Sequence, residues 1–202
     1  TYSCLLTISG SSISAGTTLV VNDTSTVLYQ LVKLTATTAL ALLEGDTKNS
    51  VVVLSVSGTT VSKGTEVNWY DNTADQKPFT MTALTSTKVI VAYRNMKLAN
   101  GNAGTLYPKC RLLTINGTSV TSGSEVNIES VSSNWISVAR LTDTKAIVIY
   151  SLTTSTAWYP KASILNLDGS TITPTTPSVL FSSVAQYLTV EPYSSGRVMM
   201  TY

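Results

Sequence analysis

The chain has no histidine, and only 12% of its 202 residues are charged. Without an imidazole, nucleophile triads based on histidine and zinc sites that need histidine are excluded. The two cysteines, Cys4 and Cys110, are too few to form a zinc or iron–sulfur centre by themselves. We interpret both as small buried residues, and we predict no metal and no cofactor.

Clustered charge and long apolar runs are absent as well. The 13 basic and 11 acidic residues are scattered and leave a net charge of +2, which does not resemble the basic footprint of a nucleic-acid-binding protein. Apolar runs are short, as at Val51–Leu54, whereas a membrane-spanning helix needs about 18 residues or more. We therefore predict neither a nucleic-acid partner nor insertion into a membrane.

What the chain has in abundance is serine and threonine, 60 residues together. Short β-branched runs meet at dipeptides such as Asn116-Gly117 and Asp168-Gly169, which favour type I′ turns because both central positions need a positive φ. No window keeps a 3.6-residue hydrophobic period. The sequence predicts an all-β protein.

Two phrases recur along the chain. The first reads LLTISGSSISAG after Cys4 and LLTINGTSVTSG after Arg111, with related segments starting at Val51 and Ser163. Its turn glycines lie 48, 59 and 52 residues apart, at Gly10, Gly58, Gly117 and Gly169. The second phrase starts at Leu34, Leu84, Leu141 and Tyr193, at spacings that drift in step with the first. Two anchors that move together indicate an internal repeat.

Each repeat is predicted to form four short strands, and four-stranded units of about 50 residues are typical of β-propeller blades. We predict one domain, 1–202, with units at approximately 1–49, 50–104, 105–156 and 157–202, arranged as a propeller-like ring or arc. The chain opens on the first phrase and closes on the second. If a blade begins with the second phrase, the terminal strands could share one sheet and close the ring.

The repeat phrases resemble those of β-propeller modules in phage tail or fibre proteins and in secreted bacterial surface proteins. The segments that carry the resemblance are VLSVSGTTVSKGTEV at 53–67 and LTSTKVIVAYRN at 84–95. The resemblance implies a binding or assembly element, often one for cell-surface glycans, and it brings no catalytic residues with it.

Recurring side chains favour structural roles over catalysis. Glu66 and Glu125 each follow a glycine by two positions, so successive units would hold them far apart, unlike the carboxylate pair of a glycosidase. We interpret them as polar residues of surface strands. Tyr93, Tyr150 and Tyr202 share one repeat position, with Leu43 as the fourth member, and we predict that they pack between units. We do not expect an enzyme.

Aromatic residues are the candidates for ligand binding. Tyr107 and the pair Trp158-Tyr159 precede a shared Pro-Lys, and Trp69-Tyr70 form another pair. An exposed aromatic face can stack on a sugar ring while neighbouring polar groups satisfy its hydroxyls. The alternative is that these aromatics cover the sheet beneath them.

Two functions follow from this pattern. The first is a non-enzymatic recognition module, extracellular or on a virion, that binds a cell-surface glycan. The second is a structural component of a fibre, capsid decoration or surface layer, whose partners are other subunits, because a chain with so few charges is prone to associate. A homo-oligomer fits either function.

Overall fold

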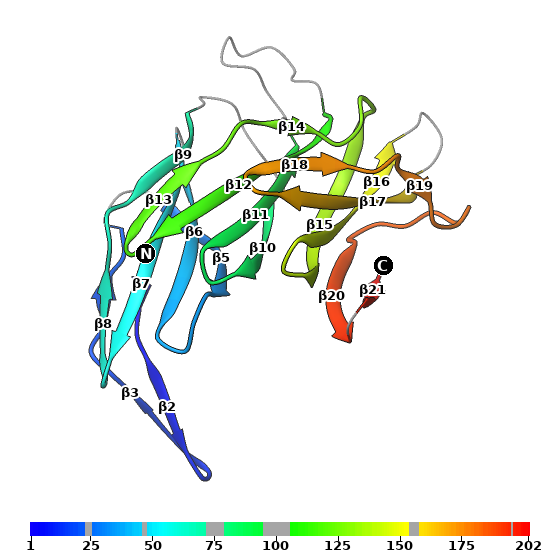
Figure 1. Ribbon diagram of the computed structural model, residues 1–202. Coiled ribbons are helices and arrows are strands. Elements are labelled where there is room, and N and C mark those ends of the chain that lie inside the picture. The colour runs from blue at the N-terminus through cyan, green and yellow to red at the C-terminus, as the bar shows by residue number, and fades with distance from the viewer. Residues whose placement is uncertain (23–25, 46–47, 72–78, 95–105, 154–157, 195) are drawn as a thin grey trace. The chain divides into compact units, whose positions relative to one another are not determined.

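The computed structural model describes residues 1–22, 26–45, 48–71, 79–94, 106–153, 158–194 and 196–202 (Figure 1). Every regular element in these ranges is a β-strand, which confirms the all-β prediction. No helix that is long and apolar enough to cross a membrane occurs in the described ranges. The strands form separate sheets, and the propeller-like ring stays a prediction.

The chain divides into two compact units, which are described separately here. Unit 1 comprises residues 1–71 and 115–121, and unit 2 comprises 72–114 and 122–202. The short segment 115–121 lies at the hairpin that joins two strands of a sheet whose other strands belong to unit 2.

Unit 1 contains a five-stranded sheet, sheet one. Its order is β5-β6-β7-β8, and β9 also pairs with β7. The bounds are β5 Thr26–Lys33, β6 Thr38–Gly45, β7 Lys48–Ser57, β8 Thr60–Lys63 and β9 Val67–Asp71. Ala41 and Leu43 of β6 are buried together with Val21 of the N-terminal segment, and the partly buried Leu19 packs against them, so this segment covers one face of the sheet.

The N-terminal segment of unit 1 forms two small strand pairs. β1 (Tyr2–Ser3) pairs with β4 (Leu19–Val20), and β2 (Leu6–Ser9) forms a hairpin with β3 (Ser12–Ala15). Every residue of the β2–β3 hairpin is exposed, including its apolar side chains.

Two further five-stranded sheets have the strand order of sheet one. Sheet two is β10-β11-β12-β13 with β14 on β12, and sheet three is β15-β16-β17-β18 with β19 on β17. Their strands are β10 Phe79–Thr85, β11 Lys88–Arg94, β12 Pro108–Asn116, β13 Ser119–Ser122, β14 Val126–Asn127, β15 Ser133–Thr142, β16 Lys145–Thr153, β17 Trp158–Asp168, β18 Thr171–Pro174 and β19 Ser178–Val179. The two sheets bury a common core that includes Ile90, Cys110, Val138 and Leu165.

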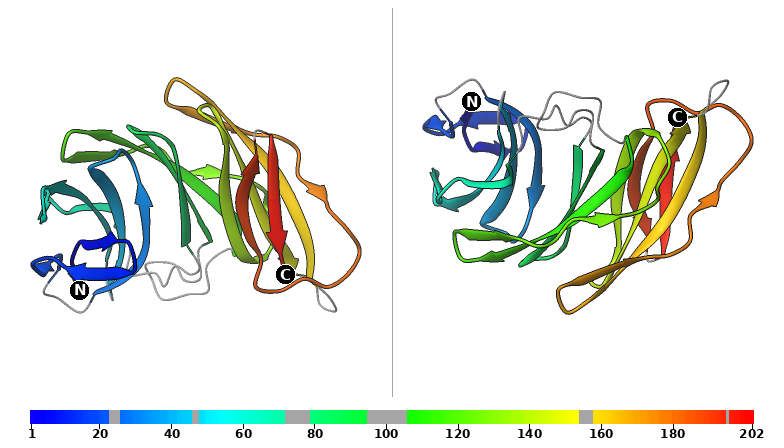
Figure 2. Two further views of the ribbon diagram at one scale, coloured as in Figure 1. Left: turned by 90° about the horizontal axis from the view of Figure 1, so that it is seen from below. Right: turned by 90° about the horizontal axis from the view of Figure 1, so that it is seen from above.

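The last two strands of unit 2 form a separate hairpin. β20 (Thr189–Ser194) pairs with β21 (Arg197–Thr201), and Figure 2 shows this hairpin lying against sheet three. Val190, Val198 and Met200 join a core with Ala139 and Ile149 of that sheet. The backbone N–H of Val190 also donates a hydrogen bond of 3.1 Å to Ser137 Oγ.

The recurring phrases have a visible structural basis. In the second phrase a threonine hydroxyl accepts a backbone N–H two residues ahead, at Thr35, Thr85 and Thr142, over 3.1–3.2 Å. In the first phrase the turn glycines adopt φ values of +58° to +60°, which only glycine adopts without cost. The predicted hairpins therefore form, but not as the predicted type I′ turns. Asp168 pairs with Thr171, so Gly169 and Ser170 are the central residues, and of these two only the glycine has a positive φ.

The sheets begin with the second phrase and end with the first. The predicted unit boundary between residues 49 and 50 consequently lies inside β7, and the other two boundaries lie outside the described residues. The framing that the sequence left open, with the apolar hairpin first, is the one in which the five-stranded sheets form.

Candidate functional site

The predicted aromatic residues occupy different sheets. Tyr107 directly precedes β12, whereas Trp158 and Tyr159 open β17, where they pair with Thr153 and Leu152. All three are partly buried. They lie at strand entries, and each residue is partly exposed to solvent.

The other predicted pair, Trp69 and Tyr70, lies in β9 and is buried. Trp69 is 2% exposed and Tyr70 is 9% exposed, and their ring centroids are 5.7 Å apart. A ligand can stack only on a ring face that it can reach. These two residues belong to the packing of unit 1, and we no longer consider them candidates for ligand binding.

Glu125 is more than a surface strand residue. Its carboxylate accepts a hydrogen bond of 2.7 Å from the Tyr93 hydroxyl and one of 2.5 Å from Lys109 Nζ. Arg111 Nε donates to the same Tyr93 oxygen over 2.9 Å. Lys109 is almost fully buried, so the carboxylate supplies the counter-charge that a buried ammonium needs.

Sheet three repeats this arrangement with a different glutamate. Tyr150 and Lys161, which match Tyr93 and Lys109 in their sheet positions, donate hydrogen bonds of 2.6 and 2.5 Å to Glu129. The position that matches Glu125 is Pro177, and the carboxylate comes from the connection before β15 instead. The sequence did not single out Glu129, because it follows no repeat position.

In sheet one the same place is held by Glu66. Its carboxylate accepts hydrogen bonds of 2.6 Å from Ser50 Oγ and 2.7 Å from Asn22 Nδ2. Ser50 and Leu43 stand where sheet two has Lys109 and Tyr93. Each five-stranded sheet thus places one carboxylate beside its central strands, and we call this recurring group the carboxylate clasp.

The carboxylate clasp suits a structural role. Tyr93 and Tyr150 are 0% exposed, and burial, followed by the neighbouring glutamate, raises the pKa of both hydroxyls far above the ordinary value of 10. A buried, neutral tyrosine can neither reach a substrate nor act as a nucleophile. The packing role predicted for these tyrosines and for Leu43 agrees with their burial, whereas Tyr202 is 66% exposed.

The cysteines differ from each other. Cys110 is fully buried, as predicted, and burial together with the charge of Glu125 raises the pKa of its thiol to about 12. Cys4 is exposed, contrary to the prediction that both thiols are buried, because it lies in the N-terminal segment with its small strand pairs. No cluster of metal-ligating side chains occurs among the residues that the structure describes.

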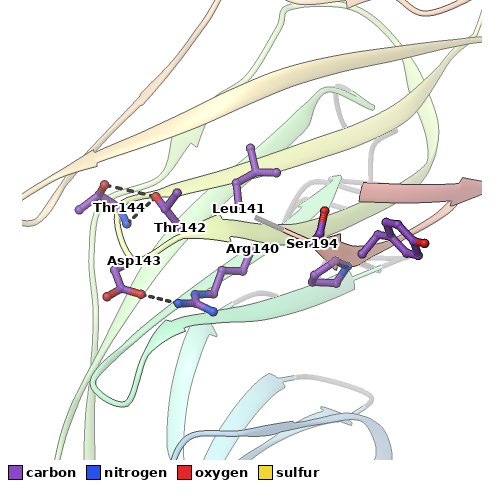
Figure 3. Close-up of a pocket in the computed structure, with 8 residues that line it drawn as sticks. Arg140, Leu141, Thr142, Asp143, Thr144 and Ser194 are labelled. Atoms are coloured by element: carbon purple, nitrogen blue, oxygen red, sulfur yellow. Dashed lines mark hydrogen bonds and ion pairs between the residues drawn. The ribbon is translucent and has the colours of Figure 1, made fainter. Parts of the chain in front are cut away.

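One surface hollow of unit 2 lies between two hairpins. It has a volume of about 600 Å³ and is lined by Arg140, Leu141, Thr142, Asp143 and Thr144 of the β15–β16 hairpin and by Pro192, Tyr193 and Ser194 of β20 (Figure 3). We call it the turn pocket. Its lining combines one aromatic ring with hydroxyl, carboxylate and guanidinium groups.

The polar groups of the turn pocket are arranged by local bonds. Arg140 Nη2 lies 2.5 Å from Asp143 Oδ1, and Thr142 Oγ1 accepts the Thr144 backbone N–H over 3.2 Å (Figure 3). Both charged side chains remain substantially exposed. Tyr193 is 68% exposed, so its ring is available to a ligand. In the sequence Tyr193 is recognisable only as the start of a repeat phrase, because nothing in the sequence places the two turns side by side.

A second exposed tyrosine lies elsewhere in unit 2. Tyr187 is 69% exposed and its ring centroid lies 4.1 Å from that of Trp135. Both residues have positive φ values, 54° and 45°, which are uncommon outside glycine. The strained backbone holds these two rings against each other next to the core beneath the β20–β21 hairpin.

Comparison of the chain with known protein families and with curated proteins gives no match to either.

Proposed function

We propose that the protein is a non-enzymatic recognition module that binds a neutral carbohydrate at the turn pocket. The observation that carries the proposal is the combination of an exposed Tyr193 ring with converging hydroxyl, carboxylate and guanidinium groups. Sugar rings present an apolar face to an aromatic side chain and hydroxyls to polar groups around it. Because Arg140 is already paired with Asp143, the pocket favours a neutral sugar over an acidic one.

The proposed setting is the cell exterior or a virion surface, with a surface glycan as partner. The scarcity of charge and the abundance of Ser and Thr support this setting, together with the resemblance of the repeat phrases to phage and bacterial surface modules. The partly buried rings of Tyr107, Trp158 and Tyr159 form a second proposed contact for the same kind of ligand.

The finer architecture belongs to the same proposal. Four repeat units would form a propeller-like ring or arc, in which the terminal strands contribute to one sheet. The shared strand order of sheets one, two and three supports it, since like sheets can stack face to face.

A titration of the full chain tests the carbohydrate proposal. Wild-type protein is screened against immobilised neutral surface oligosaccharides, and the affinity for the best ligand is measured by calorimetry. We expect Tyr193→Ala to weaken binding at least tenfold, which corresponds to about 1.4 kcal/mol, because the stacking face is removed. Arg140→Ala is expected to weaken binding as well.

Tyr187→Ala is the matched control, since Tyr187 is equally exposed in the same unit but does not line the turn pocket. It should keep the wild-type affinity. Unchanged binding by Tyr193→Ala, with the fold intact, would contradict the assignment of the pocket.

Assembly is the second proposed function, and one observation favours it. The N-terminal hairpin exposes large apolar side chains, with Leu6 59%, Ile8 72% and Ile13 69% accessible. Apolar strands of this kind are typical of surfaces that become covered in an assembly. Light scattering across a range of concentrations distinguishes the functions, because an assembly protein gains mass with concentration whereas a free recognition module does not.

A further inference from the structure

The β20–β21 hairpin has the geometry of the first two strands of a five-stranded sheet. Ser194 pairs with Arg197 after a register irregularity, just as Thr85 pairs with Lys88 in sheet two and Thr142 with Lys145 in sheet three. In the described residues β21 has no sheet neighbour other than β20. The hairpin is therefore half of a sheet.

The N-terminal segment has the geometry of the last three strands. In each five-stranded sheet a backbone N–H just after the fourth strand donates to the third strand over 2.8 Å, for example Gly64 to Val53 and Gly123 to Leu112. Gly16 donates to Leu5 over the same distance. The pair β1 and β2 thus corresponds to the third strand, β3 to the fourth and β4 to the fifth.

Leu6 is exposed at a position that the three complete sheets bury. By that hydrogen bond Leu6 corresponds to Leu54, Leu113 and Leu165, which are 7%, 0% and 0% exposed. Leu6 is 59% exposed. A position that is buried in all three complete sheets is open where the first two strands are missing.

Unit 1 also contains a hollow that a missing strand would fill. An apolar pocket of about 210 Å³ lies beside Leu5 and is lined by Leu31, Leu54 and Val61 of sheet one, among others. In unit 2 the matching residues, Val138, Leu165 and Ile172, pack together with Ile90 of β11.

Alignment of β21 with β11 indicates which side chain would fill that pocket. Ile90 is the second residue after Lys88, and the second residue after Arg197 in β21 is Met199. Ile90 is 0% exposed, whereas Met199 is 56% exposed. Unit 1 therefore has an apolar pocket at the place where Ile90 packs in unit 2. Met199, which matches Ile90 in register, is an exposed apolar side chain that could fill it.

We propose that β21 pairs antiparallel with β1 and β2 of the same chain and completes a fourth five-stranded sheet. In the register common to the other sheets, Arg197 lies opposite Thr7, Met199 opposite Leu5 and Met200 opposite Cys4. Met199 fills the apolar pocket of unit 1. The chain's own strands are favoured over those of a second copy because both halves are tethered, which raises their effective concentration. This inference does not depend on carbohydrate binding.

A single substitution tests the register, because Cys4 is already a free thiol. Directly opposed residues of antiparallel strands have Cα atoms about 4.5–5.5 Å apart, within the range that a disulfide spans. We expect the Met200→Cys variant to form a disulfide between Cys4 and the introduced thiol under mild oxidation, detected as a cross-linked peptide by mass spectrometry of monomeric protein.

Met199→Cys is the matched control. It places a thiol one residue away in the same strand, but on the other face of the sheet, so we expect no cross-link to Cys4. Cys4→Ser combined with Met200→Cys should give none either. A second pair, Ser3→Cys with Thr201→Cys in Cys4→Ser protein, covers the case in which Met200→Cys does not fold, because Thr201 is exposed.

Each remaining outcome overturns the inference. A disulfide found only in covalent dimers would show that a second copy supplies the strand. Folded protein that forms no disulfide with either pair, or that links Cys4 to a cysteine at position 199 as readily as to one at position 200, would show that the proposed register is wrong.

Discussion

Three buried side chains make the free energy of unfolding depend on pH in the alkaline range. They are Tyr93, Tyr150 and Cys110. Burial raises the pKa of the Cys110 thiol from 9.0 to about 12, and it raises the pKa of both tyrosine hydroxyls above 10.0. These groups lose their protons in the unfolded chain at a lower pH than in the folded protein. Unfolding is therefore favoured as the pH rises, since the unfolded state binds fewer protons.

We predict that the free energy of unfolding is constant near neutral pH and falls from about pH 9 upward. The contribution of Cys110 is complete below its unfolded pKa of 9.0 and is lost as the pH approaches 12. Each group that titrates only in the unfolded chain lowers the free energy by at most about 1.4 kcal/mol per pH unit. Urea unfolding between pH 7 and 11 measures the slope.

Cys110→Ala provides the comparison for this slope. It removes one of the three protons, so the free energy of unfolding should fall less steeply between pH 9 and 11, even if the variant is less stable overall. A wild-type curve that stays level to pH 11 would contradict the argument.

The exposure of single residues is the property that the sequence predicted least well. Trp69 and Trp158 each precede a tyrosine in the sequence, yet the first is 2% exposed and the second is only partly buried. A short β-strand can be buried on both faces. The alternation of apolar and polar residues along it then does not indicate which side chains are exposed. Tyr193 became a candidate only because two turns meet, which is a tertiary property.

At the level of elements, the carboxylate clasp connects strands with a segment outside them. In sheet two Glu125 joins Tyr93 of β11 and Lys109 of β12 to the connection before β14. The short fifth strand has two paired residues, so it depends on such side-chain contacts for its position. The clasp therefore fixes the outer part of sheets one and two, where the glutamate directly precedes the fifth strand, whereas in sheet three it fixes the connection before β15.

We predict that Glu125→Ala lowers the free energy of unfolding by about 2 kcal/mol. The substitution leaves a nearly buried ammonium and a buried hydroxyl without their acceptor, and hydrogen bonds to charged groups contribute about 1.5–3 kcal/mol each, reduced here because Glu125 is 26% exposed. Asp143→Ala removes a much more exposed carboxylate and should change stability by less than about 0.5 kcal/mol. Equal effects of the two substitutions would argue against the clasp.

Elements with strong local signals were predictable from the sequence, and partners distant in the chain were not. The glycine turns and the threonine turns follow from side-chain and backbone chemistry within four residues, and the structure confirms these hairpins. Glu129 was not predictable, because it replaces the acceptor that Pro177 cannot supply and lies 32 residues from Lys161. A repeat pattern predicts residues at recurring positions. It does not predict that a residue from elsewhere in the chain, such as Glu129, takes over the role of one of them.

For the whole molecule, the two terminal half-sheets, β20–β21 and β1–β4, bear most directly on whether the protein associates. Leu6 is exposed although its counterparts in all three complete sheets are buried, and Met199 is exposed although its counterparts in sheets one and two, Leu40 and Ile90, are buried. Unpaired sheet edges of this kind invite pairing with other strands. If the halves pair with each other, the same residues that would promote aggregation become part of a core.

This difference predicts the outcome of Leu6→Lys. If the fourth sheet forms, Leu6 is buried like Leu54, and a lysine there should lower the free energy of unfolding by more than about 3 kcal/mol, because a charge without a partner enters an apolar site. If the halves stay apart, Leu6 is a surface residue and the change should stay within about 0.5 kcal/mol. Val184→Lys, at a 52% exposed loop position, is the control and should be neutral in both cases. Urea unfolding measured at several protein concentrations decides between them, and it also separates closure within one chain from pairing between copies, since only pairing between copies makes the midpoint depend on concentration.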